Sequence, residues 1–459
     1  CLTLLLMPVI DKRANRLLYG IDYLLIKSVS FVLWIIRYSL PTKWSELISK
    51  EDRHINVLNN VVGLTFFNAL GGMLLLFTQI KLANYMGAAL YGIYSYYLAL
   101  GEVGANVVRY GRDKTMLREL VQKPEEQRSL ITHTFILGLI NLSIFMILVV
   151  IFHESLDVVF SLSTLLLILS PCLISLDFQP VYESLRMMSW HSMYYFLQKI
   201  LFLFCVWGLL ISDIPVSLCG ISFILFISWI FVLFLQYREI TSQLGIRIFR
   251  SLRWKNLLGL YRQGFFIALS CLLSVAFGPL IRLVLNMYVD SYAVGVYAAG
   301  LQIYSIGLFL LLQIGRVGNP MMAELGKNSS EREKRCLFVR RYLLIMIVCV
   351  LPFSIALFFF PDTIVCSLFT SEYVELSSML PIFAIYLLVY SIGNVFIQFL
   401  IAFRKDKIYF TIFSIGAILT VLFAFILIPS YGVIGATLAL CVPHGLTCLA
   451  YCIFSLKYL

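Results

Sequence analysis

The segment Ile80-Lys81-Leu82, followed by Gly92-Ile93-Tyr94, has a second copy in Ile281-Arg282-Leu283, followed by Gly295-Val296-Tyr297. The first copy closes one apolar stretch and opens the next, and the second copy does the same in the other half of the chain. A pattern that returns in corresponding places indicates an internal repeat. The chain is therefore predicted to consist of two similar halves.

Long apolar stretches fill most of the chain after the first fifty or so residues. Hydrophobic residues make up 61% of the 459 residues and charged residues only 13%, which excludes an ordinary soluble protein. A helix needs about 20 apolar residues to cross the hydrocarbon core, and the chain holds about twelve such stretches. They lie roughly at 57–84, 90–112, 129–152, 157–179, 191–212, 215–237, 264–288, 293–317, 337–360, 377–402, 408–428 and 431–456. We expect an all-α membrane protein of about twelve transmembrane helices, in two bundles of about six related by a parallel repeat, V-shaped with a central cavity.

Lysine and arginine gather in alternate gaps between these stretches. Short cytoplasmic loops retain basic residues, so the basic gaps and both termini are assigned to the cytoplasm. Arg186 and Lys199 are interpreted as the flanks of one such gap, and only Lys81 and Arg282 fall near the opposite side. The outer gaps are short and hold acidic residues instead: Glu154, Asp157, Asp213, Asp290, Asp362, Glu372 and Glu375. The predicted location is the bacterial cytoplasmic (inner) membrane, with many spans.

The same pattern predicts the domain organisation. Residues 1–56 form a cytoplasmic leader with an interfacial helix. Residues 57–237 form an N-terminal lobe, 238–263 a basic cytoplasmic linker and 264–459 a C-terminal lobe. The net charge of +11 follows from this topology beside an anionic leaflet, so no nucleic-acid partner is expected.

Several classes of function are disfavoured by what the gaps lack. No outer gap is large enough for a domain that would bind a polymer acceptor, as a polymerase or ligase needs. The 11 cysteines lie in apolar stretches or cytoplasmic gaps except Cys366, so no disulfide framework is expected. Neither a metal-binding spacing nor a phosphate-cradling glycine loop stands out. We expect a carrier and not an enzyme, without a bound cofactor, driven by a coupling ion (H⁺ or Na⁺), by the membrane potential or by consumption of its product.

Four stretches resemble turns of the polysaccharide and O-antigen flippases, in the multidrug/oligosaccharidyl-lipid/polysaccharide exporter superfamily. They are Met86–Tyr94, its echo Ala293–Ala298, Leu368–Tyr373 and Ile428–Thr437, and the resemblance spans residues 57 to 456. Thr370 departs from the pattern, because the family often has glycine there.

The resemblance implies a two-lobed transporter that flips a polyprenyl-diphosphate-linked oligosaccharide across the inner membrane by alternating access, for surface polysaccharide biosynthesis. Its partners would be membrane lipids and the polysaccharide polymerase and chain-length machinery, and we expect a monomer.

Such a substrate needs cations for its diphosphate. Arg282 lies about seven residues inside its helix end, or ~10 Å, at a depth where a charged side chain is costly and usually faces a wet cavity. We expect Lys81 and Arg282 to bind phosphate together in the central cavity, since arginine can hold an oxyanion with two donors. The alternative is that both side chains reach outward to lipid headgroups. Intramembrane amides could bind sugar hydroxyls or join helices instead: Asn68, Gln79 and Gln302.

A second group of polar residues shares one face of the second predicted helix, at helical spacing: Glu102, Asn106, Arg109 and Asp113. Glu102 lies near mid-bilayer, where it could carry a coupling proton or be held by a neighbouring cation. Asp177 could act in coupling or be structural. Arg109 and Arg316 could gate the cytoplasmic mouth or simply anchor their helices.

Two other functions remain open. An ion-coupled multidrug or toxin extruder of the same superfamily would favour buried carboxylates, and the predicted seventh span holds Arg282 but no acid. A membrane-embedded glycosyl or acyl transferase would need paired carboxylates or a histidine beside a substrate loop, and neither stands out.

Overall fold

The computed structural model describes residues 53–122, 127–156, 158–185, 187–211, 217–244, 254–327 and 332–457. Across these ranges the chain is helical and contains no β-strand. The predicted interfacial helix of the leader lies outside the described residues.

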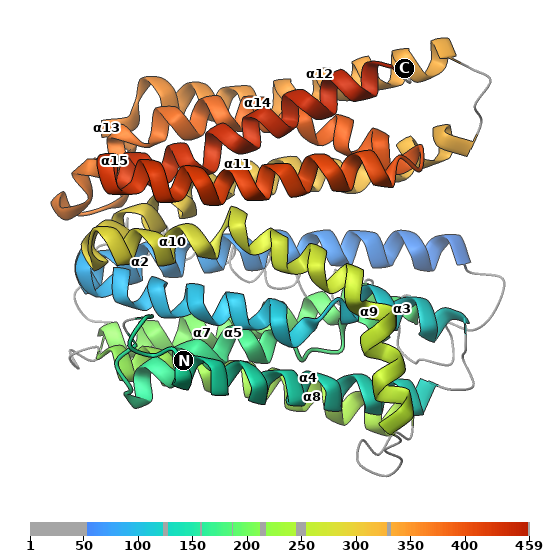
Figure 1. Cartoon of the computed structure of the whole chain (residues 1–459), viewed down its shortest axis with the longest axis horizontal. Coiled ribbons are helices and arrows are strands. Elements are labelled where there is room, and N and C mark those ends of the chain that lie inside the picture. The colour runs from blue at the N-terminus through green and yellow to red at the C-terminus, as the bar shows by residue number, and fades with distance from the viewer. Residues whose placement is uncertain are drawn as a thin grey trace, which may run out of the picture.

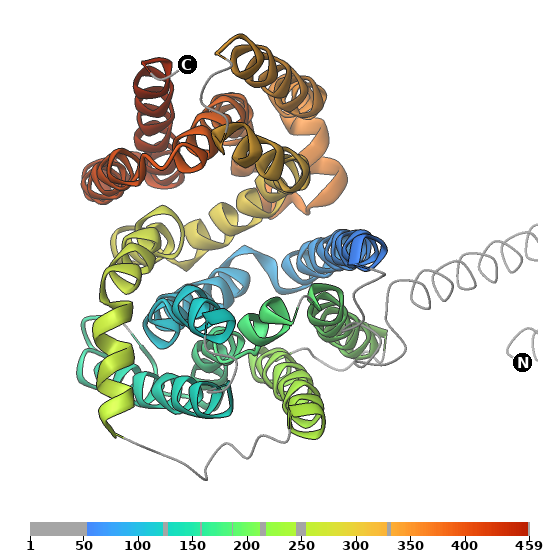
Figure 2. The same ribbon diagram turned by 90° about the vertical axis from the view of Figure 1, so that its right-hand side faces the viewer.

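The helices form two lobes, one above the other in Figure 2. The N-terminal lobe contains α2 (Arg53–Arg109), α3 (Arg112–Gln122), α4 (Gln127–Ile151), α5 (Leu162–Ile174), α6 (Gln179–Ser184), α7 (Met188–Ile211) and α8 (Leu218–Leu244). The C-terminal lobe contains α10 (Pro279–Tyr288), α11 (Ser291–Lys327), α12 (Arg332–Phe359), α13 (Pro361–Leu368), the 3₁₀ segment η5 (Ser371–Ser378), α14 (Leu380–Ala402) and α15 (Asp406–Leu456). The two lobes are connected by α9 (Trp254–Ser274), which runs along the N-terminal lobe and ends in the 3₁₀ turn η4 (Val275–Phe277) just before α10. Both α8 and α9 extend into the segment 238–263 that the sequence marks as a linker.

Two of these helices are hairpins with a sharp reversal. At 57 residues α2 would be ~86 Å long if straight, against ~30 Å of hydrocarbon. It turns at Gly87, whose φ of 72° is one that glycine adopts without strain, and Figure 1 shows the chain doubling back there. In the same way α15 turns at Gly432 (φ 54°), which brings the ring of Tyr451 onto that of Tyr409. Glycine therefore sets the reversal in both lobes.

Nine helices among the described residues are long and apolar enough to cross a membrane, or up to ten if the bent pair of α9 with η4 and α10 is one span. Their flanks expose large apolar side chains such as Met73, Phe204 and Ile211, as a lipid environment requires. The predicted fold class, an all-α multi-pass membrane protein, is confirmed, while the count of about twelve spans stays a prediction.

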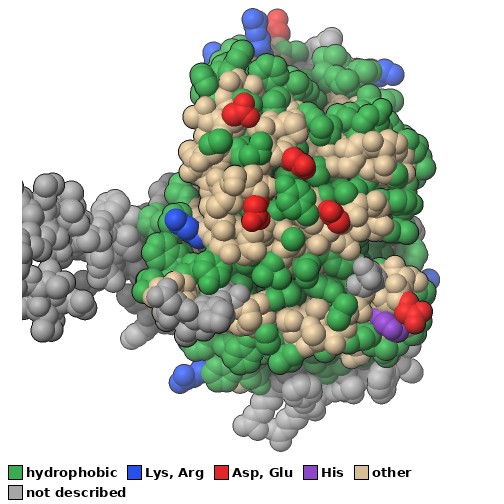
Figure 3. All heavy atoms as spheres, turned by 90° about the vertical axis from the view of Figure 1, so that its left-hand side faces the viewer, with side chains coloured by type: hydrophobic (Ala, Val, Ile, Leu, Met, Phe, Trp, Pro, Cys, Tyr) green, Lys and Arg blue, Asp and Glu red, His purple; other side chains and the backbone are tan. Residues whose placement is uncertain are grey.

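The two ends of the molecule differ in charge. The end at the left of Figure 1, which we call the outer end, faces the viewer in Figure 3, and acidic side chains are scattered across it. Exposed acids in its turns are Asp290, Asp362, Glu372 and Glu375. The opposite end, the inner end, holds the start of α2 and the end of α15. These acids come from gaps that the charge pattern assigns to the outer side.

Candidate functional site

The repeated glycines meet each other at the outer end. A Cβ on Gly92 of α2 would lie 1.6 Å from the carbonyl oxygen of Ser291, and one on Gly295 of α11 would lie 1.9 Å from that of Ala88. The two helices therefore cross with their backbones in contact, through a small residue every fourth position on each. The internal repeat thus supplies both halves of one contact between the lobes.

A second contact closes the same end. The segment 368–373, at the end of α13 and the start of η5, docks on the turn of α2. The amide of Asn84 donates to Leu368 O at 2.7 Å and accepts from the Thr370 N–H at 3.1 Å, and the Ala88 N–H donates to Glu372 Oε2 at 2.8 Å. The hydroxyl of Tyr373 donates to Ala83 O at 2.9 Å. We call these bonds, together with the glycine crossing, the outer junction.

One donor of the outer junction is insensitive to pH. Burial raises the pKa of the Tyr373 hydroxyl above its ordinary value, so the group stays protonated across the physiological range. The bond from Tyr373 to Ala83 O therefore persists wherever the lobes meet.

At the inner end α9 lies against the N-terminal lobe. The Tyr261 hydroxyl donates to Asn141 Oδ1, and its ring meets the ring of Tyr110 edge to face with centroids 4.9 Å apart. Gly111, with φ of 66°, lies under Ile267 so closely that a Cβ would be 2.7 Å from its Cγ2. We call this contact the inner junction.

Between the lobes lies a cavity of about 310 Å³, which we call the central cavity. Its walls are α2, α5 and the break between α9 and α10: Glu102, Ala105, Asn106, Arg109, Pro171, Ile174, Ser274 and Pro279. After the 47° bend, α10 begins at Pro279 without a side-chain cap, and free N–H groups at a helix start favour anions. The volume is at the small end of ligand pockets of roughly 300–1,000 Å³, so a bulky substrate requires the lobes to separate.

An ion pair joins the lobes at this cavity. The guanidinium of Arg282 on α10 binds the carboxylate of Glu102 on α2, and it also donates to Ser95 Oγ at 3.3 Å. Arg282 is 12% exposed and Glu102 42%, so the carboxylate is the more accessible partner. The Nε of Arg282 is buried without a hydrogen-bond partner in the described structure. Arg282 is therefore a neutralised cation that retains one unused donor.

The other residues expected to bind substrate lie elsewhere. Lys81 is exposed, with its ammonium 5.9 Å from the centre of the Phe77 ring, and no contact joins it to Arg282. The side chain of Gln79 is buried between Tyr91 and Tyr94 in the α2 hairpin, at 3.2 and 3.3 Å.

Two further amides on the predicted list join helices. Asn68 of α2 donates to Ser192 of α7 at 3.3 Å. Gln302 lies within hydrogen-bonding range of Tyr91, in the other lobe. The structure therefore does not gather the predicted substrate residues into one cluster.

The predicted coupling and gating residues are also dispersed. Arg109 lines the central cavity and pairs with Asp113 one turn on, at 3.2 Å. Asn106 donates back to Glu102 O at 2.9 Å within α2. Arg316 lies in α11, and its side chain falls outside the described part of the structure.

Asp177 belongs to a buried cluster inside the N-terminal lobe. Its carboxylate binds His191 Nε2 and the Tyr195 hydroxyl, both at 2.8 Å, and its backbone oxygen accepts from Arg112 at 2.8 Å. Sequence reasoning missed His191 and Arg112, because nothing in their spacing links them to Asp177. Among the described residues no cluster of histidine, cysteine or acids suits a metal ion.

Lys199 is the residue that the sequence placed wrongly. It was expected to flank a cytoplasmic gap, but α7 begins at Met188 and ends at Ile211, so Lys199 lies halfway along it. Its depth is ~16 Å from the start of the helix at 1.5 Å per residue. The apolar residues on both sides of Lys199 in the sequence could have shown that it lies inside a span.

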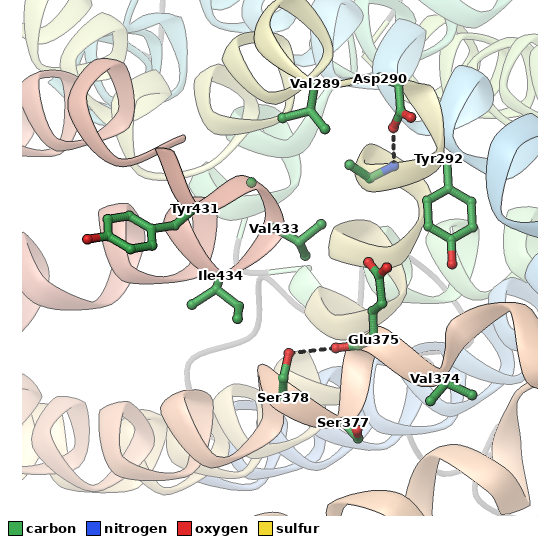
Figure 4. A pocket seen from close by; sticks show the side chains of 12 residues that line it. Val289, Asp290, Tyr292, Val374, Glu375, Ser377, Ser378, Tyr431, Val433 and Ile434 are labelled. Carbon is green, nitrogen blue, oxygen red and sulfur yellow. Dashed lines mark hydrogen bonds between the residues drawn. The ribbon is translucent and has the colours of Figure 1, made fainter. Parts of the chain in front are cut away.

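A second cavity, of about 590 Å³, opens in the C-terminal lobe at the outer end. It lies among the turn before α11, η5 and the bend of α15, and the carboxylates of Asp290 and Glu375 point toward each other across it while the Tyr431 ring points away (Figure 4). Its lining contains no lysine or arginine. An anionic group would find no counter-charge here, so the central cavity is the better candidate site.

Comparisons with known proteins agree on the class of molecule. A model of the family described as polysaccharide biosynthesis protein matches residues 57–326. No curated protein sequence matches the chain.

Solved structures share its fold. A lipid II flippase, MurJ, in an inward closed conformation is 16% identical with a TM-score of 0.69, over 86% of this chain and 87% of that one. An inward-facing multidrug resistance MATE family transporter is 13% identical with a TM-score of 0.65, over 86% and 94%. The Vibrio cholerae MATE transporter VcmN in its bent form is 14% identical with a TM-score of 0.57, over 88% and 96%. At these identities the likeness concerns the fold.

Proposed function

The chain belongs to the polysaccharide biosynthesis protein family, and we propose that it flips polyprenyl-diphosphate-linked oligosaccharide units across the bacterial cytoplasmic membrane by alternating access. In this proposal both termini lie in the cytoplasm, an orientation that the acidic outer end and the basic gaps of the sequence support. The polymerase that joins the delivered units would be its downstream partner.

The observation that carries the proposal is the ion pair between Arg282 and Glu102 at the wall of the central cavity. Each partner comes from a different lobe, so any event that separates the pair also loosens the lobes. A diphosphate is an oxyanion that can compete with Glu102 for the guanidinium. In this proposal the ion pair between Arg282 and Glu102 keeps the two lobes together at the central cavity until the diphosphate of the substrate binds Arg282.

The expected coupling ion (H⁺ or Na⁺) fits the same exchange. When a diphosphate binds Arg282, the carboxylate of Glu102 loses its counter-charge and is free to take up the coupling cation instead. Glu102 would then hold that ion while the substrate is bound and release it when the ion pair forms again. This gives the coupling ion a defined place without a further site.

The direct test is the fate of lipid-linked units in a strain that lacks the protein. We expect complete units to accumulate on the cytoplasmic side while surface polysaccharide disappears. Normal surface polysaccharide with altered sensitivity to cationic drugs would instead favour multidrug extrusion. Missing or shortened lipid-linked units would indicate a glycosyl or acyl transferase.

Arg282 is tested in the same strain by complementation. Arg282→Ala should abolish export although the protein inserts normally, because Glu102 is left as an unpaired carboxylate and the diphosphate loses its partner. Arg282→Lys should retain part of the export, since it keeps the charge but loses the two-pronged geometry. Full export by a normally expressed Arg282→Ala variant would contradict the role of the pair.

A further inference from the structure

The seam between α2 and α7 carries two lysines that the central cavity does not use. Lys199 lies halfway along α7, at a depth where an ammonium group is costly and usually marks a substrate or ion pathway. No hydrogen bond or ion pair joins its side chain to the described residues. A lysine at that depth without a protein counter-charge is available to bind an anionic group.

The backbone of α2 makes room for this lysine. A Cβ on Gly71 would lie 3.0 Å from Lys199 Cδ and 3.4 Å from its Nζ, so the lysine chain occupies the space that a side chain at position 71 would fill. The next residue, Gly72, faces the Phe309 ring of α11 in the other lobe. This part of α2 therefore lies between α7 and the C-terminal lobe, at the edge where the two lobes adjoin.

Aromatic rings continue the seam toward the outer end. The Phe77 ring stacks on Trp207 of α7 with centroids 5.6 Å apart, and the Lys81 ammonium lies over that Phe77 ring. The side chain of Phe77 is 45% exposed, and that of Met73, one helical turn before it on α2, is 64% exposed. From Gly71 to Lys81 the rise along α2 is ~15 Å. The seam thus presents a half-buried cation, an exposed apolar surface and a second cation in succession.

We propose that Lys199 and Lys81 are successive binding positions for the diphosphate of a polyprenyl lipid that moves along the α2–α7 seam, its chain remaining in the bilayer against Met73 and Phe77. The proposal rests on the proposed function and assigns it a lipid-side path. Ammonium groups bind phosphate as point charges, which suits a group in transit better than a bidentate clamp does.

Binding of three probes to purified protein in detergent tests the chemistry: a polyprenyl diphosphate, the matching polyprenol without phosphate, and inorganic diphosphate. We expect the first to bind and Lys199→Met to weaken its binding about tenfold, the order of one lost charge-assisted hydrogen bond. Lys199→Arg should retain most of the affinity. Tight binding of inorganic diphosphate alone would assign the lysines to a free anion and overturn the lipid path.

A second variant moves the lysine without removing its charge. Gly71→Ala places a methyl group against Lys199 Cδ and should weaken binding less than Lys199→Met does. Lys457→Met is the matched control, because that exposed lysine near the end of α15 lies over Phe454, away from the seam. Thermal unfolding of each variant shows whether the fold is retained.

Flipping by the same variants in proteoliposomes separates the two levels of the proposal. If the wild-type protein flips lipid-linked oligosaccharide and Lys199→Met flips it equally fast with equal affinity for the diphosphate, the seam proposal is wrong and the proposed function stands. If the wild-type protein does not flip it, the proposed function itself fails.

Discussion

The outer and inner junctions lie on either side of the central cavity along α2 and are made of different kinds of contact. At the outer junction the backbones of α2 and α11 touch through Gly92 and Gly295, and the segment 368–373 adds hydrogen bonds to main-chain groups of the α2 turn. At the inner junction α9 rests on the N-terminal lobe through one Tyr261–Asn141 hydrogen bond, an aromatic contact and a close packing at Gly111.

The difference between the two junctions indicates from which end the central cavity opens more easily. Main-chain hydrogen bonds and a glycine crossing require exact alignment, so the outer junction is made or broken as a unit. The inner junction depends on fewer polar bonds, and each net hydrogen bond contributes only about 1 kcal/mol. We therefore infer that the cavity opens more readily toward the inner end, which is the side from which the proposed function requires substrate to enter.

The largest effect is expected from Gly92→Ala. The added methyl would lie 1.6 Å from Ser291 O, so α2 and α11 must move apart and the outer junction cannot close as it does here. Overpacking of this kind costs about 1–3 kcal/mol or more, and flipping in proteoliposomes should fall by roughly fivefold to a hundredfold or more. Gly208→Ala is the control, since nothing lies within 4 Å of a Cβ at that position. Equal flipping rates for the two variants would show that the close contact of α2 and α11 at the glycines is not needed for flipping.

An intermediate effect is expected from Glu372→Ala. It deletes the carboxylate that caps the N–H of Ala88, a loss of about 1 kcal/mol that raises the outward-open population roughly fivefold. Labelling by a membrane-impermeant thiol reagent, in a cysteine-free background with Ser95→Cys, should become faster from the outer side. Glu375→Ala is the control variant, because Glu375 lies in the same segment but lines the second cavity, in the C-terminal lobe. If the two glutamate variants label at the same rate, the carboxylate of Glu372 does not hold the lobes together.

The smallest effect is expected from Tyr261→Phe at the inner junction. It removes one hydrogen bond, worth about 1 kcal/mol, and leaves the aromatic contact with Tyr110 in place. Thiol labelling from the inner side should increase modestly while the flipping rate changes little, and Tyr237→Phe should have no effect on either. A loss of flipping as severe as that of Gly92→Ala would reverse the ranking of the two junctions.

The sequence predicted the helices and the repeat because both depend on local patterns. Apolar length marks a span, and a glycine followed by a tyrosine marks the turn in each half. Nothing local reveals that Gly92 and Gly295 touch each other, or that the segments 86–94 and 368–373, each noted separately, are two sides of one contact.

The candidate site was predictable only in part, for an electrostatic reason. Arg282 and Glu102 were each recognised as costly intramembrane charges, but their pairing depends on how α10 lies against α2. Lys199 was misplaced because the charge pattern assigns each cation to the nearest gap, although Lys199 falls inside the predicted apolar stretch 191–212. Asp177 needed His191 and Arg112, which two other helices bring to it.

The most direct test is flipping with the outer junction locked. In a cysteine-free background, Asn84→Cys with Thr370→Cys joins α2 to the segment 368–373, where the native pair is bonded at 3.1 Å. Proteoliposomes containing a labelled lipid-linked oligosaccharide would be assayed with the cross-link oxidised and then reduced. We predict that oxidation stops flipping and reduction restores it. Flipping at full rate through an oxidised junction would contradict alternating access in this protein.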